Sequence, residues 1–588
     1  MKKYIMLALS GMLATSCIDT SVLPNDITIA EDYWKNKADV QNMVASAYLG
    51  MVSGGTVPTN LIVWGGFRSD ELNPTETIIN DGRWDDLKKI NLGNLDKTNQ
   101  YCNWSTLYTV INRCNQVLER APQVVEIDPA YTEDTYNTDK SQMLALRALC
   151  YFYLVRTFRD VPYNEQAYYN SSQEMMVAQM APAAVLDKCI NDLLEAERTP
   201  LSANAYDPTD WRRYGYINID GVRAILADIY LWRASVTHSA EDYQKCVDYC
   251  NLVIESKKAN YVPGRFETEV KEYPLALSTK FYQDVFVTEN SQESIFELQM
   301  DGSHNSNTAI QYMYFEWKGG QKYGFMQASK VFGTLGSNAI DETSVFSTNA
   351  DKRYFQACFN VSDADATYFD VRKMVDKSPL SEPTQAAQRP SASSGLERTN
   401  FGQNLIIYRL SDVMLMKAEA LVQLADDAAD VTTDDKLAEA FALVKYVDDR
   451  AIGEEPTKDG YRLKVTDYAT KADMEKLVLA ERLRELCFEG KRWYDLMRYN
   501  YRHVNAADYT KTMAELAGDN ASMAAFPANS QEMMTIVQRK YIENAAAITS
   551  KIKNEAYLYF PVDDDEIKVN NMLKQNPAYA DDDKYVKN

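Results

Sequence analysis

Histidine is scarce in this chain of 588 residues, which contains only three. Acid–base catalysis near neutral pH and zinc coordination both rely mainly on histidine, so the composition favours neither. Positive charge is also in deficit: 62 lysines and arginines face 84 aspartates and glutamates, a net charge of −22. A nucleic-acid partner requires a positive field, so none is expected. Beyond the N-terminal region no apolar run reaches 18 residues, which excludes a further membrane-spanning helix.

Recognisable catalytic motifs are missing as well. The sequence contains no Gly-x-Ser-x-Gly elbow, no phosphate-binding loop, no HExxH helix and no Rossmann fingerprint. A glycosidase needs two carboxylates at a set separation, and so acidic a chain always supplies pairs whose spacing the sequence does not reveal. We therefore predict a binding protein and not an enzyme, without catalytic residues, metal ligands or cofactors.

The first twenty residues carry an export signal. Two lysines precede a short apolar stretch, and three small residues stand directly before Cys17. The stretch is too short to span a bilayer and is typical of secretory signals. The arrangement resembles the lipobox of bacterial lipoproteins, which implies cleavage before Cys17 and lipid on its thiol. We therefore expect a signal peptide over residues 1–16 and a lipidated tether over 17–30. Ordinary secretion with an incidental cysteine is the alternative.

Eight further cysteines follow Cys17, an even number that would suit disulfides in an exported protein. Their positions favour a different interpretation, because Cys246 and Cys250 share one apolar helical stripe and Cys189 lies on another. Free cysteine behaves as a small buried hydrophobic residue. We therefore predict buried free thiols in preference to disulfides.

Apolar residues recur at helical spacing along most of the chain. Residues 143–158 are apolar nearly all round and predict a central buried helix. Two antiparallel helices fit within 222–254, with alanines at the close contacts, as in tetratricopeptide-type repeats. We predict a mainly α fold with one body over 31–588. Its helical repeats are expected at about 37–55, 102–256 and 408–450.

The helical period fades in two portions of the chain, about 260–404 and 498–588. Residues 291–300 alternate as in a β-strand, while 377–400 are rich in serine, proline and glutamine, as in an exposed loop. An acidic run at 581–583 closes the chain and is expected to be solvated. Because ligand sites tend to lie on irregular segments held by a rigid scaffold, we expect the ligand-binding residues in such segments.

Four stretches resemble the signatures of the SusD-like (RagB/SusD) family of outer-membrane nutrient-binding lipoproteins. They are ALRALCYFYL at 145–154 with FRDVPY at 158–163, YRLSDVMLMKAEA at 408–420, ERLRELCFEGKRWYDL at 481–496, and YLYFPV at 557–562 with QNPAY at 575–579. They occur in the family's order, and the resemblance covers essentially the whole mature chain.

The resemblance implies a helical-repeat scaffold with a loop-rich, minor β portion, displayed on the surface of a Gram-negative outer membrane. Family members cap a SusC-like TonB-dependent barrel transporter, capture glycans for import and are non-catalytic. We therefore expect the chain to capture an oligo- or polysaccharide and deliver it to such a transporter. A peptide-binding member of the family, and a helical-repeat interaction scaffold without such a ligand, stay open as alternatives.

Sugar rings present apolar C–H faces rimmed by hydroxyl groups, so flat aromatic side chains beside polar groups suit them. Two irregular segments, 64–84 and 311–320, combine aromatic residues, glycines and polar groups. In the family the site is likewise built from loops of the first hundred residues and of the central region. The predicted ligand residues are the platforms Trp84 and Trp317, the side wall Tyr314, and the hydroxyl partners Asp70 and Arg83. Each aromatic residue has packing of its loop onto the helices as an alternative role.

The charged residues of the third signature carry a different prediction. Arg482, Glu485 and Glu489 are interleaved with apolar residues on one helix. Charges at this spacing more often link neighbouring helices than bind ligands. We therefore assign them to the scaffold.

Overall fold

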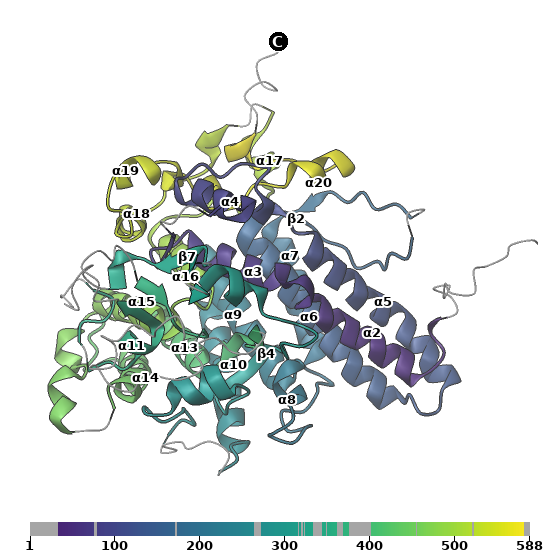
Figure 1. Cartoon of the computed structure of the whole chain (residues 1–588), viewed down its shortest axis with the longest axis horizontal. Coiled ribbons are helices and arrows are strands. Elements are labelled where there is room, and N and C mark those ends of the chain that lie inside the picture. The colour runs from purple at the N-terminus through teal and green to yellow at the C-terminus, as the bar shows by residue number, and fades with distance from the viewer. Residues whose placement is uncertain are drawn as a thin grey trace, which may run out of the picture.

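The structure is a computed structural model of the whole chain (Figure 1). It describes residues 33–75, 79–170, 173–263, 272–314, 317–318, 321–322, 324–332, 344–348, 350–360, 369–375, 401–453, 456–519 and 522–580. The signal peptide, the tether with Cys17, the 377–400 loop and the acidic run at 581–583 lie outside these residues.

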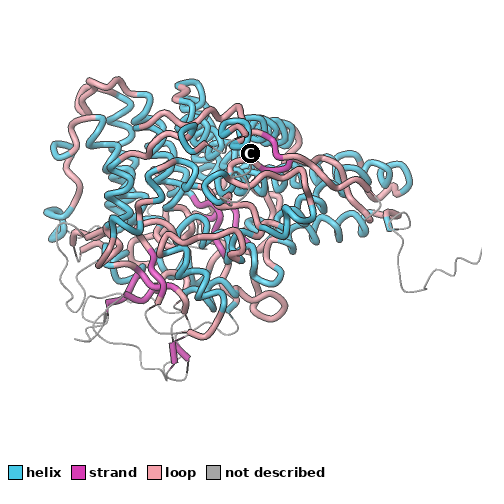
Figure 2. The backbone as a smooth tube through the Cα atoms, turned by 90° about the horizontal axis from the view of Figure 1, so that it is seen from above, coloured by secondary structure: helices cyan, strands magenta, loops and turns pink. Residues whose placement is uncertain are grey.

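Helices that follow one another along the chain pack side by side and build most of the body, as the tube in Figure 2 shows. The series continues across the middle of the chain, because α10 packs on both α9 and α13. The scaffold helices are α2 (Lys37–Gly50), α5 (Ser105–Ile127), α6 (Glu133–Phe158), α7 (Pro182–Ala196), α9 (Ile219–Thr237), α10 (Ala240–Ala259), α13 (Leu410–Leu424), α14 (Asp435–Ile452), α15 (Lys471–Leu486) and α16 (Arg492–His503). The predicted mainly α, tetratricopeptide-like scaffold is confirmed.

Helix α6 is the predicted central helix, and every residue of it from Ser141 to Phe158 is buried. Thr132 caps its first turn, where the Thr132 hydroxyl accepts a hydrogen bond from the Thr135 amide at 3.3 Å. It ends where Arg159 adopts a left-handed φ of 67°. A helix that is apolar on all sides is stable only when neighbours cover it, and α5, α7 and α9 do so.

The pair α9–α10 has the compact turn expected of a helical repeat. His238 ends α9 with a left-handed φ of 58°, and Ser239 caps α10 by accepting a hydrogen bond from the Asp242 amide at 3.2 Å. Ala224, Ala227 and Ala234 are fully buried on α9. Small side chains at these positions let the neighbouring helices approach closely.

Strands form a minor part of the fold and join segments that are distant in the chain. One antiparallel sheet has the order β1 (Leu72–Pro74), β7 (Met326–Ala328), β9 (Phe369–Val371) and β8 (Cys358–Asn360). Strand β4 (Ser294–Leu298), where β alternation was predicted, pairs with β10 (Leu405–Arg409). Two short pairs remain: β2 (Val161–Pro162) with β3 (Gln179–Met180), and β5 (Trp317–Lys318) with β6 (Gln321–Lys322).

Shorter helices complete the loop-rich portions. They are α3 (Thr56–Ile62), α4 (Gly82–Asn91), α8 (Arg212–Gly215), α11 (Arg353–Ala357), α17 (Met513–Ala517), α18 (Gln531–Gln538), α19 (Ala545–Ile548) and α20 (Asp564–Val569). Two π-helical turns, Val63–Phe67 and Ile310–Tyr314, lie in the two segments predicted to bind ligand. Figure 1 places α4 and α17 to α20 at one edge of the molecule, at the top of the view.

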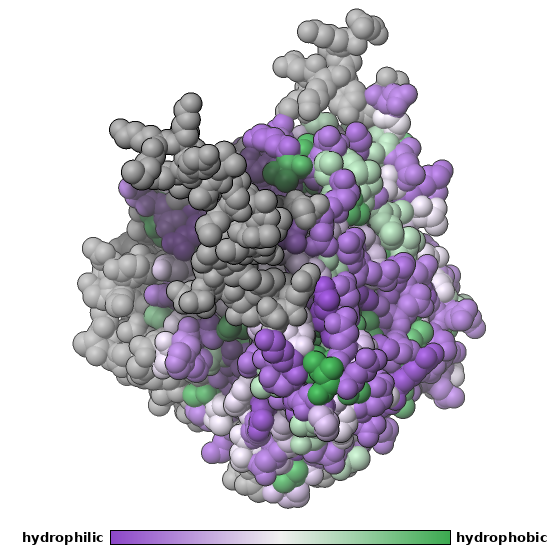
Figure 3. All heavy atoms as spheres, turned by 90° about the vertical axis from the view of Figure 1, so that its right-hand side faces the viewer, coloured by the Kyte–Doolittle hydropathy of each residue, from purple (hydrophilic) through white to green (hydrophobic). Residues whose placement is uncertain are grey.

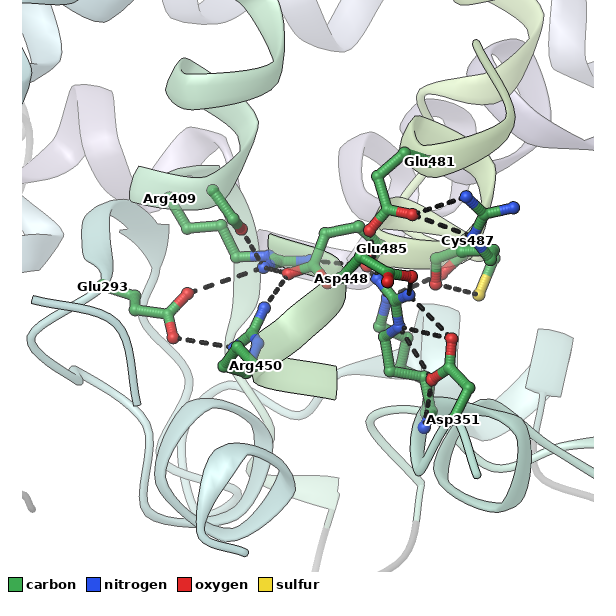
Figure 4. Close-up of polar contacts among 12 residues, drawn as sticks. Glu293, Asp351, Arg409, Asp448, Arg450, Glu481, Glu485 and Cys487 are labelled. Carbon is green, nitrogen blue, oxygen red and sulfur yellow. Dashed lines mark hydrogen bonds and ion pairs between the residues drawn. The ribbon is translucent and has the colours of Figure 1, made fainter. Parts of the chain in front are cut away.

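The charges of the third signature link helices through a buried network (Figure 4). Glu485 on α15 forms ion pairs with Arg409, Arg450 and Arg353, which come from the ends of β10, α14 and α11. Burial alone would raise the pKa of the Glu485 carboxyl, but the three guanidinium groups hold it well below its usual range. Glu489 pairs with Arg409 at 2.8 Å. The prediction that these residues belong to the scaffold is confirmed.

All eight cysteines after Cys17 are buried free thiols, as predicted. The Sγ atoms of Cys246 and Cys250 lie 4.0 Å apart on α10, about twice the length of a disulfide bond. The face of the molecule turned to the viewer in Figure 3 is largely hydrophilic, with small, separate apolar patches. Within the described part of the chain, none of the helices combines the length and the hydropathy needed to cross a bilayer.

Candidate functional site

The two segments predicted to bind ligand lie side by side in the structure. Strand β1 pairs with β7 so that Leu72 faces Ala328 and Pro74 faces Met326. The pairing is extended by the Thr75 amide, which donates to the Phe325 carbonyl at 2.9 Å. A short antiparallel ladder therefore connects a loop of the first hundred residues to the central region.

The first of these segments is fixed against the scaffold by a close backbone approach. A Cβ atom on Gly65 would lie 1.7 Å from the carbonyl oxygen of Gly490, the turn between α15 and α16. Only glycine allows this contact. The indole nitrogen of Trp64 donates to the Tyr101 carbonyl at 2.7 Å. The segment thus starts from a rigid base, and its position does not depend on a ligand.

Asp70 occupies a structural position, which corrects its predicted role as a hydroxyl partner. Its side chain is fully buried, and its two carboxylate oxygens accept from Arg492 of α16 at 2.8 and 3.1 Å. Ser329 beside β7 donates its hydroxyl to the Asp70 carbonyl at 2.5 Å. Asp70 therefore ties the loop to α16 and does not reach the surface.

Glu71, the next residue, is also buried, and its carboxyl group accepts from the Phe488 amide at 3.0 Å. Burial raises the pKa of the Glu71 carboxyl to about 8. Lys540 lies below the same loop and donates to the carbonyls of Phe67 and Leu72 at 2.9 and 3.2 Å. Burial lowers the pKa of the Lys540 ammonium to about 7. Titratable groups therefore hold the loop from beneath.

Trp84 and Tyr314 are buried too, so neither offers a ring face to a ligand in this structure. Trp84 lies on the inner side of α4 with Leu87 and Ile90, and its ring is only 3% exposed. Tyr314 is 1% exposed, and its hydroxyl donates to the Phe488 carbonyl at 2.9 Å. Both predicted ligand residues therefore take the alternative role of packing their segments onto the scaffold.

Arg83 is the predicted ligand residue that reaches the surface, with 36% of its side chain exposed. Its guanidinium group forms two hydrogen bonds to Asp81, Nε to Oδ1 at 3.0 Å and Nη2 to Oδ2 at 2.7 Å. The guanidinium carbon lies 4.0 Å from the ring centre of Tyr312, in the second segment. The hydrogen bond from Arg83 lowers the pKa of the Asp81 carboxyl, so the pair is ionised at neutral pH. A planar cation is thus clamped between a carboxylate and an aromatic ring.

Trp317 lies on β5, five residues after Tyr312. Strand β5 forms a two-residue ladder with β6, in which Trp317 faces Lys322. Its side chain lies outside the described part of the chain, and its predicted role as a platform stays a prediction. Strand β5 begins three residues after Tyr314, the last residue of the π-helical turn that carries Tyr312.

We call Asp81, Arg83 and Tyr312 the junction surface. It combines a half-buried aromatic ring, guanidinium donors and a carboxylate acceptor, which together match the apolar face and the hydroxyl rim of a sugar ring. Asp81 and Tyr312 were not among the ligand residues predicted from the sequence. For Asp81 a signal existed, because an aspartate directly before a helix start is a typical N-cap and sits beside Arg83.

Two family models match the chain. Residues 348–579 match the model of the SusD family, and residues 25–231 match a model described as starch-binding associating with outer membrane. Two relatives from Formosa agariphila, SusD-like proteins P38 and P2, are 24% and 23% identical to this chain. The alignment with P38 covers 84% of this chain and 90% of the relative, and that with P2 covers 85% and 91%.

Solved structures share the fold over nearly the whole chain. A SusD superfamily protein from Parabacteroides distasonis superposes with a TM-score of 0.63 and 20% identity, covering 92% of this chain and 98% of its own. NanU from B. fragilis gives 0.62 and 17%, covering 95% and 100%. A protein described as a laminarin binding SusD-like protein gives 0.60 and 18%, covering 93% and 100%. At this identity the likeness establishes the fold alone.

Proposed function

Because this chain belongs to the SusD-like family, we propose that it is a cell-surface lipoprotein that binds a glycan on the junction surface. It captures an oligo- or polysaccharide and passes it to a SusC-like TonB-dependent barrel transporter, without cleaving it. Lipid on Cys17 anchors it in the outer membrane. The family description "starch-binding associating with outer membrane" supports both the ligand class and the location.

The observation that carries this proposal is the Arg83–Tyr312 stack clamped by Asp81. Arg83 covers one face of Tyr312, so the C–H face of a sugar packs against the remaining part of this planar stack, while the guanidinium edge donates to hydroxyl oxygens and the carboxylate accepts from hydroxyl protons. Since Asp81 already holds Arg83 in place, little side-chain entropy is lost on binding. Trp317, five residues after Tyr312 along the chain, is proposed as a second platform.

The favoured ligand is a neutral glycan. The chain carries a net charge of −22, which repels anionic polysaccharides at long range but does not affect neutral ones. Starch and laminarin, the ligands in the descriptions of one family model and one structural neighbour, are both neutral glucans. Maltohexaose and laminarihexaose are therefore the first probes.

Titration calorimetry on the soluble chain from residue 18 onward tests the proposal. We expect Arg83→Ala and Tyr312→Ala each to weaken binding of the responsive hexasaccharide by about 1–3 kcal/mol, roughly 5- to 150-fold in Kd. Arg120→Ala is the matched control, because Arg120 stacks on Tyr169 at 4.8 Å and donates to its hydroxyl at 3.0 Å, on helix α5. If both junction variants bind as the control does, the glycan does not use this surface.

A separate assay addresses the absence of cleavage. The soluble chain is incubated with starch and laminarin, and new reducing ends are counted against a sample without protein. We expect no increase. Turnover that persists through repeated purification would show that the chain is an enzyme, and the proposed role as a binding protein would fall.

A further inference from the structure

A cleft lies between α2, β4 and the segment that leads into α8, and we call it the Trp211 cleft. It encloses about 480 Å³, within the range of small-ligand sites, roughly 300–1,000 Å³. All of its lining residues belong to the described part of the chain. Helices α8 and α4 lie at opposite edges of the molecule in Figure 1, so the cleft is separate from the junction surface.

One wall of the cleft is aromatic. Trp211 is 48% exposed, whereas the six other tryptophans with described side chains are buried. Its ring meets that of Tyr216 edge-on, with centroids 5.7 Å apart, and Tyr216 packs on Tyr48 of α2 at 4.9 Å. The indole is therefore held at the surface by neighbouring rings while much of its own area faces water. An exposed indole next to a hollow is a typical sugar platform.

Gly215 fixes how the two walls meet. A Cβ atom on this residue would lie 2.9 Å from a ring carbon of Trp211 and 2.5 Å from Cγ of Gln299. The indole and the Gln299 side chain thus both lie against the bare backbone of Gly215. Because no side chain stands between them, a flat ligand on the indole comes within reach of the amide groups.

The opposite wall is built from amides in fixed orientations. Asn290 donates to Gln299 Oε1 at 3.1 Å, and Gln299 donates back to Asn290 Oδ1 at 2.8 Å. Asn404 donates to the same Gln299 oxygen at 3.2 Å. A carboxamide offers two donors and two acceptor sites, and Gln299 uses all four, because it also donates to the Glu297 carbonyl at 3.4 Å. The contacts with Gln299 use one donor and one acceptor site of Asn290, and the Met300 amide uses one acceptor site of Asn404, so these two side chains can bond a ligand. The wall therefore presents preoriented donors and acceptors of the kind that hydroxyl groups need.

Backbone strain accompanies this wall. Glu289 and Asn290 have successive φ values of 61° and 47°, in the left-handed region that side chains other than glycine rarely adopt. The backbone amide of Asn404 donates to Glu289 Oε1 at 2.8 Å and holds the Glu289 side chain in place. Strain of this kind tends to collect where side chains are positioned for a ligand.

The edge of the cleft repeats the chemistry of the junction surface. Asp210 and Arg212 flank Trp211 and form the same two hydrogen bonds as Asp81 and Arg83, Nε to Oδ1 at 3.1 Å and Nη2 to Oδ2 at 2.6 Å, together with a third from Nε to Oδ2 at 3.1 Å. The Arg212 guanidinium lies 4.5 Å from the ring centre of Tyr206. The two sites therefore share an Asp-x-Arg clamp stacked on a tyrosine, one at each edge of the molecule.

We infer that the Trp211 cleft is a second glycan-binding site, which takes one or two neutral sugar units on the Trp211 ring with their hydroxyl groups toward Asn290 and Asn404, which Gln299 orients. The choice of sugar among polar ligands rests on the proposed function. Glu289 and Asp301 also line the cleft and disfavour anionic sugars. A chain with two separated sites holds a polysaccharide at two points, which raises its avidity.

Fluorine NMR on the soluble chain labelled with 5-fluorotryptophan tests the inference, with maltohexaose and laminarihexaose as probes. Trp211→Phe identifies the Trp211 signal, and Trp34→Phe identifies that of Trp34, a buried control residue before α2. We expect the Trp211 signal to shift saturably with at least one probe while the Trp34 signal stays in place. The same shift is expected in the Arg83→Ala/Tyr312→Ala variant, whose cleft is intact.

A substitution in the amide wall tests the same site through a loss of binding. Gln299→Leu keeps the side-chain bulk over Gly215 but removes the amide that orients Asn290 and Asn404, and we expect the Trp211 titration to weaken at least about tenfold. No Trp211 shift with either probe up to about 1 mM overturns the inference. A shift that disappears in the Arg83→Ala/Tyr312→Ala variant also overturns it, because one shared site would then explain both. If the Trp211 signal shifts while Arg83→Ala and Tyr312→Ala leave the calorimetric affinity unchanged, glycan binding at the junction surface is contradicted and glycan binding in the Trp211 cleft is supported.

Discussion

Asp70→Asn separates a structural role from a ligand-binding role at the base of the junction. The substitution removes the charge that faces Arg492, whose side chain is 5% exposed and bonded through two nitrogens. Removing one partner of a buried ion pair leaves the other charge without compensation and costs about 3–5 kcal/mol. We expect urea unfolding at pH 7 to show a loss of this size.

The matched variant is Asp81→Asn, which makes the same chemical change in the exposed clamp. The Asp81 and Arg83 side chains are 28% and 36% exposed, and such surface pairs contribute only about 0–1 kcal/mol to stability. Asp81→Asn should therefore weaken glycan binding more than it changes stability, because Arg83 loses the carboxylate that orients it. In calorimetry at low temperature, where both variants are folded, Asp70→Asn should keep the parental Kd within about threefold while Asp81→Asn weakens it.

Two outcomes would contradict these roles of Asp70 and Asp81. If Asp70→Asn unfolds like the parent and yet loses glycan affinity, Asp70 contacts the ligand and the structural assignment is wrong. If Asp81→Asn destabilises the fold as much as Asp70→Asn does, the junction surface is part of the core and does not provide a ligand site.

Three further predictions concern the loop, its backbone and the anchor. The Glu71 carboxyl has a pKa of about 8 in the fold against an ordinary value of 4.5, so its contribution to stability is present below pH 4.5 and is lost as the pH rises through 8. Glu71→Gln should therefore reduce the difference in urea unfolding free energy between pH 5 and pH 8. An unchanged difference would contradict this role of Glu71. Gly65→Ala should lower the unfolding free energy by about 1–3 kcal/mol or more, because the new Cβ meets the Gly490 carbonyl. Gly82→Ala, which has open space around it, should change the unfolding free energy by less than about 1 kcal/mol. Equal shifts of the melting temperature in the two variants would argue against the close approach at Gly65. Cys17→Ala should leave the mature chain without lipid, so it should no longer fractionate with outer membranes, and retention there would count against the anchor.

The scaffold could be predicted from the sequence because its signals are local and repeated. Helix α6 is apolar on all sides, and the turn between α9 and α10 is a short Ser-capped connection. The buried cysteines lie on apolar stripes, so their free state followed from helical spacing. The charges at Glu485 and Glu489 were likewise assigned correctly from their place among apolar neighbours.

The candidate site was harder to predict because its partners are distant in the chain. Asp70 pairs with Arg492, 422 residues away, and no local pattern points to that contact. The junction itself depends on β1 and β7, which have three residues each and too few positions to show a period. Composition pointed to the two loop segments as candidates, but composition does not say which side chains face outward.

The choice between neighbouring aromatic residues depended on the local helix. Tyr312 and Tyr314 stand two residues apart on a π-helical turn, so they point to different sides, and Tyr314 is the inner one. Trp84 follows the three-residue spacing of Leu87 and Ile90 on α4, a sign of the buried face that a loop interpretation overlooks. Once α4 is recognised as a helix, Arg83 rather than Trp84 faces outward.

The most direct test of the central claim is a crystal structure of the soluble chain with whichever hexasaccharide gives a calorimetric isotherm. We predict a sugar ring packed against the Arg83–Tyr312 stack, with hydroxyl groups bonded to Arg83 and Asp81. Clear density for the hexasaccharide elsewhere on the protein, with the Arg83–Tyr312 stack untouched by it, would contradict the account.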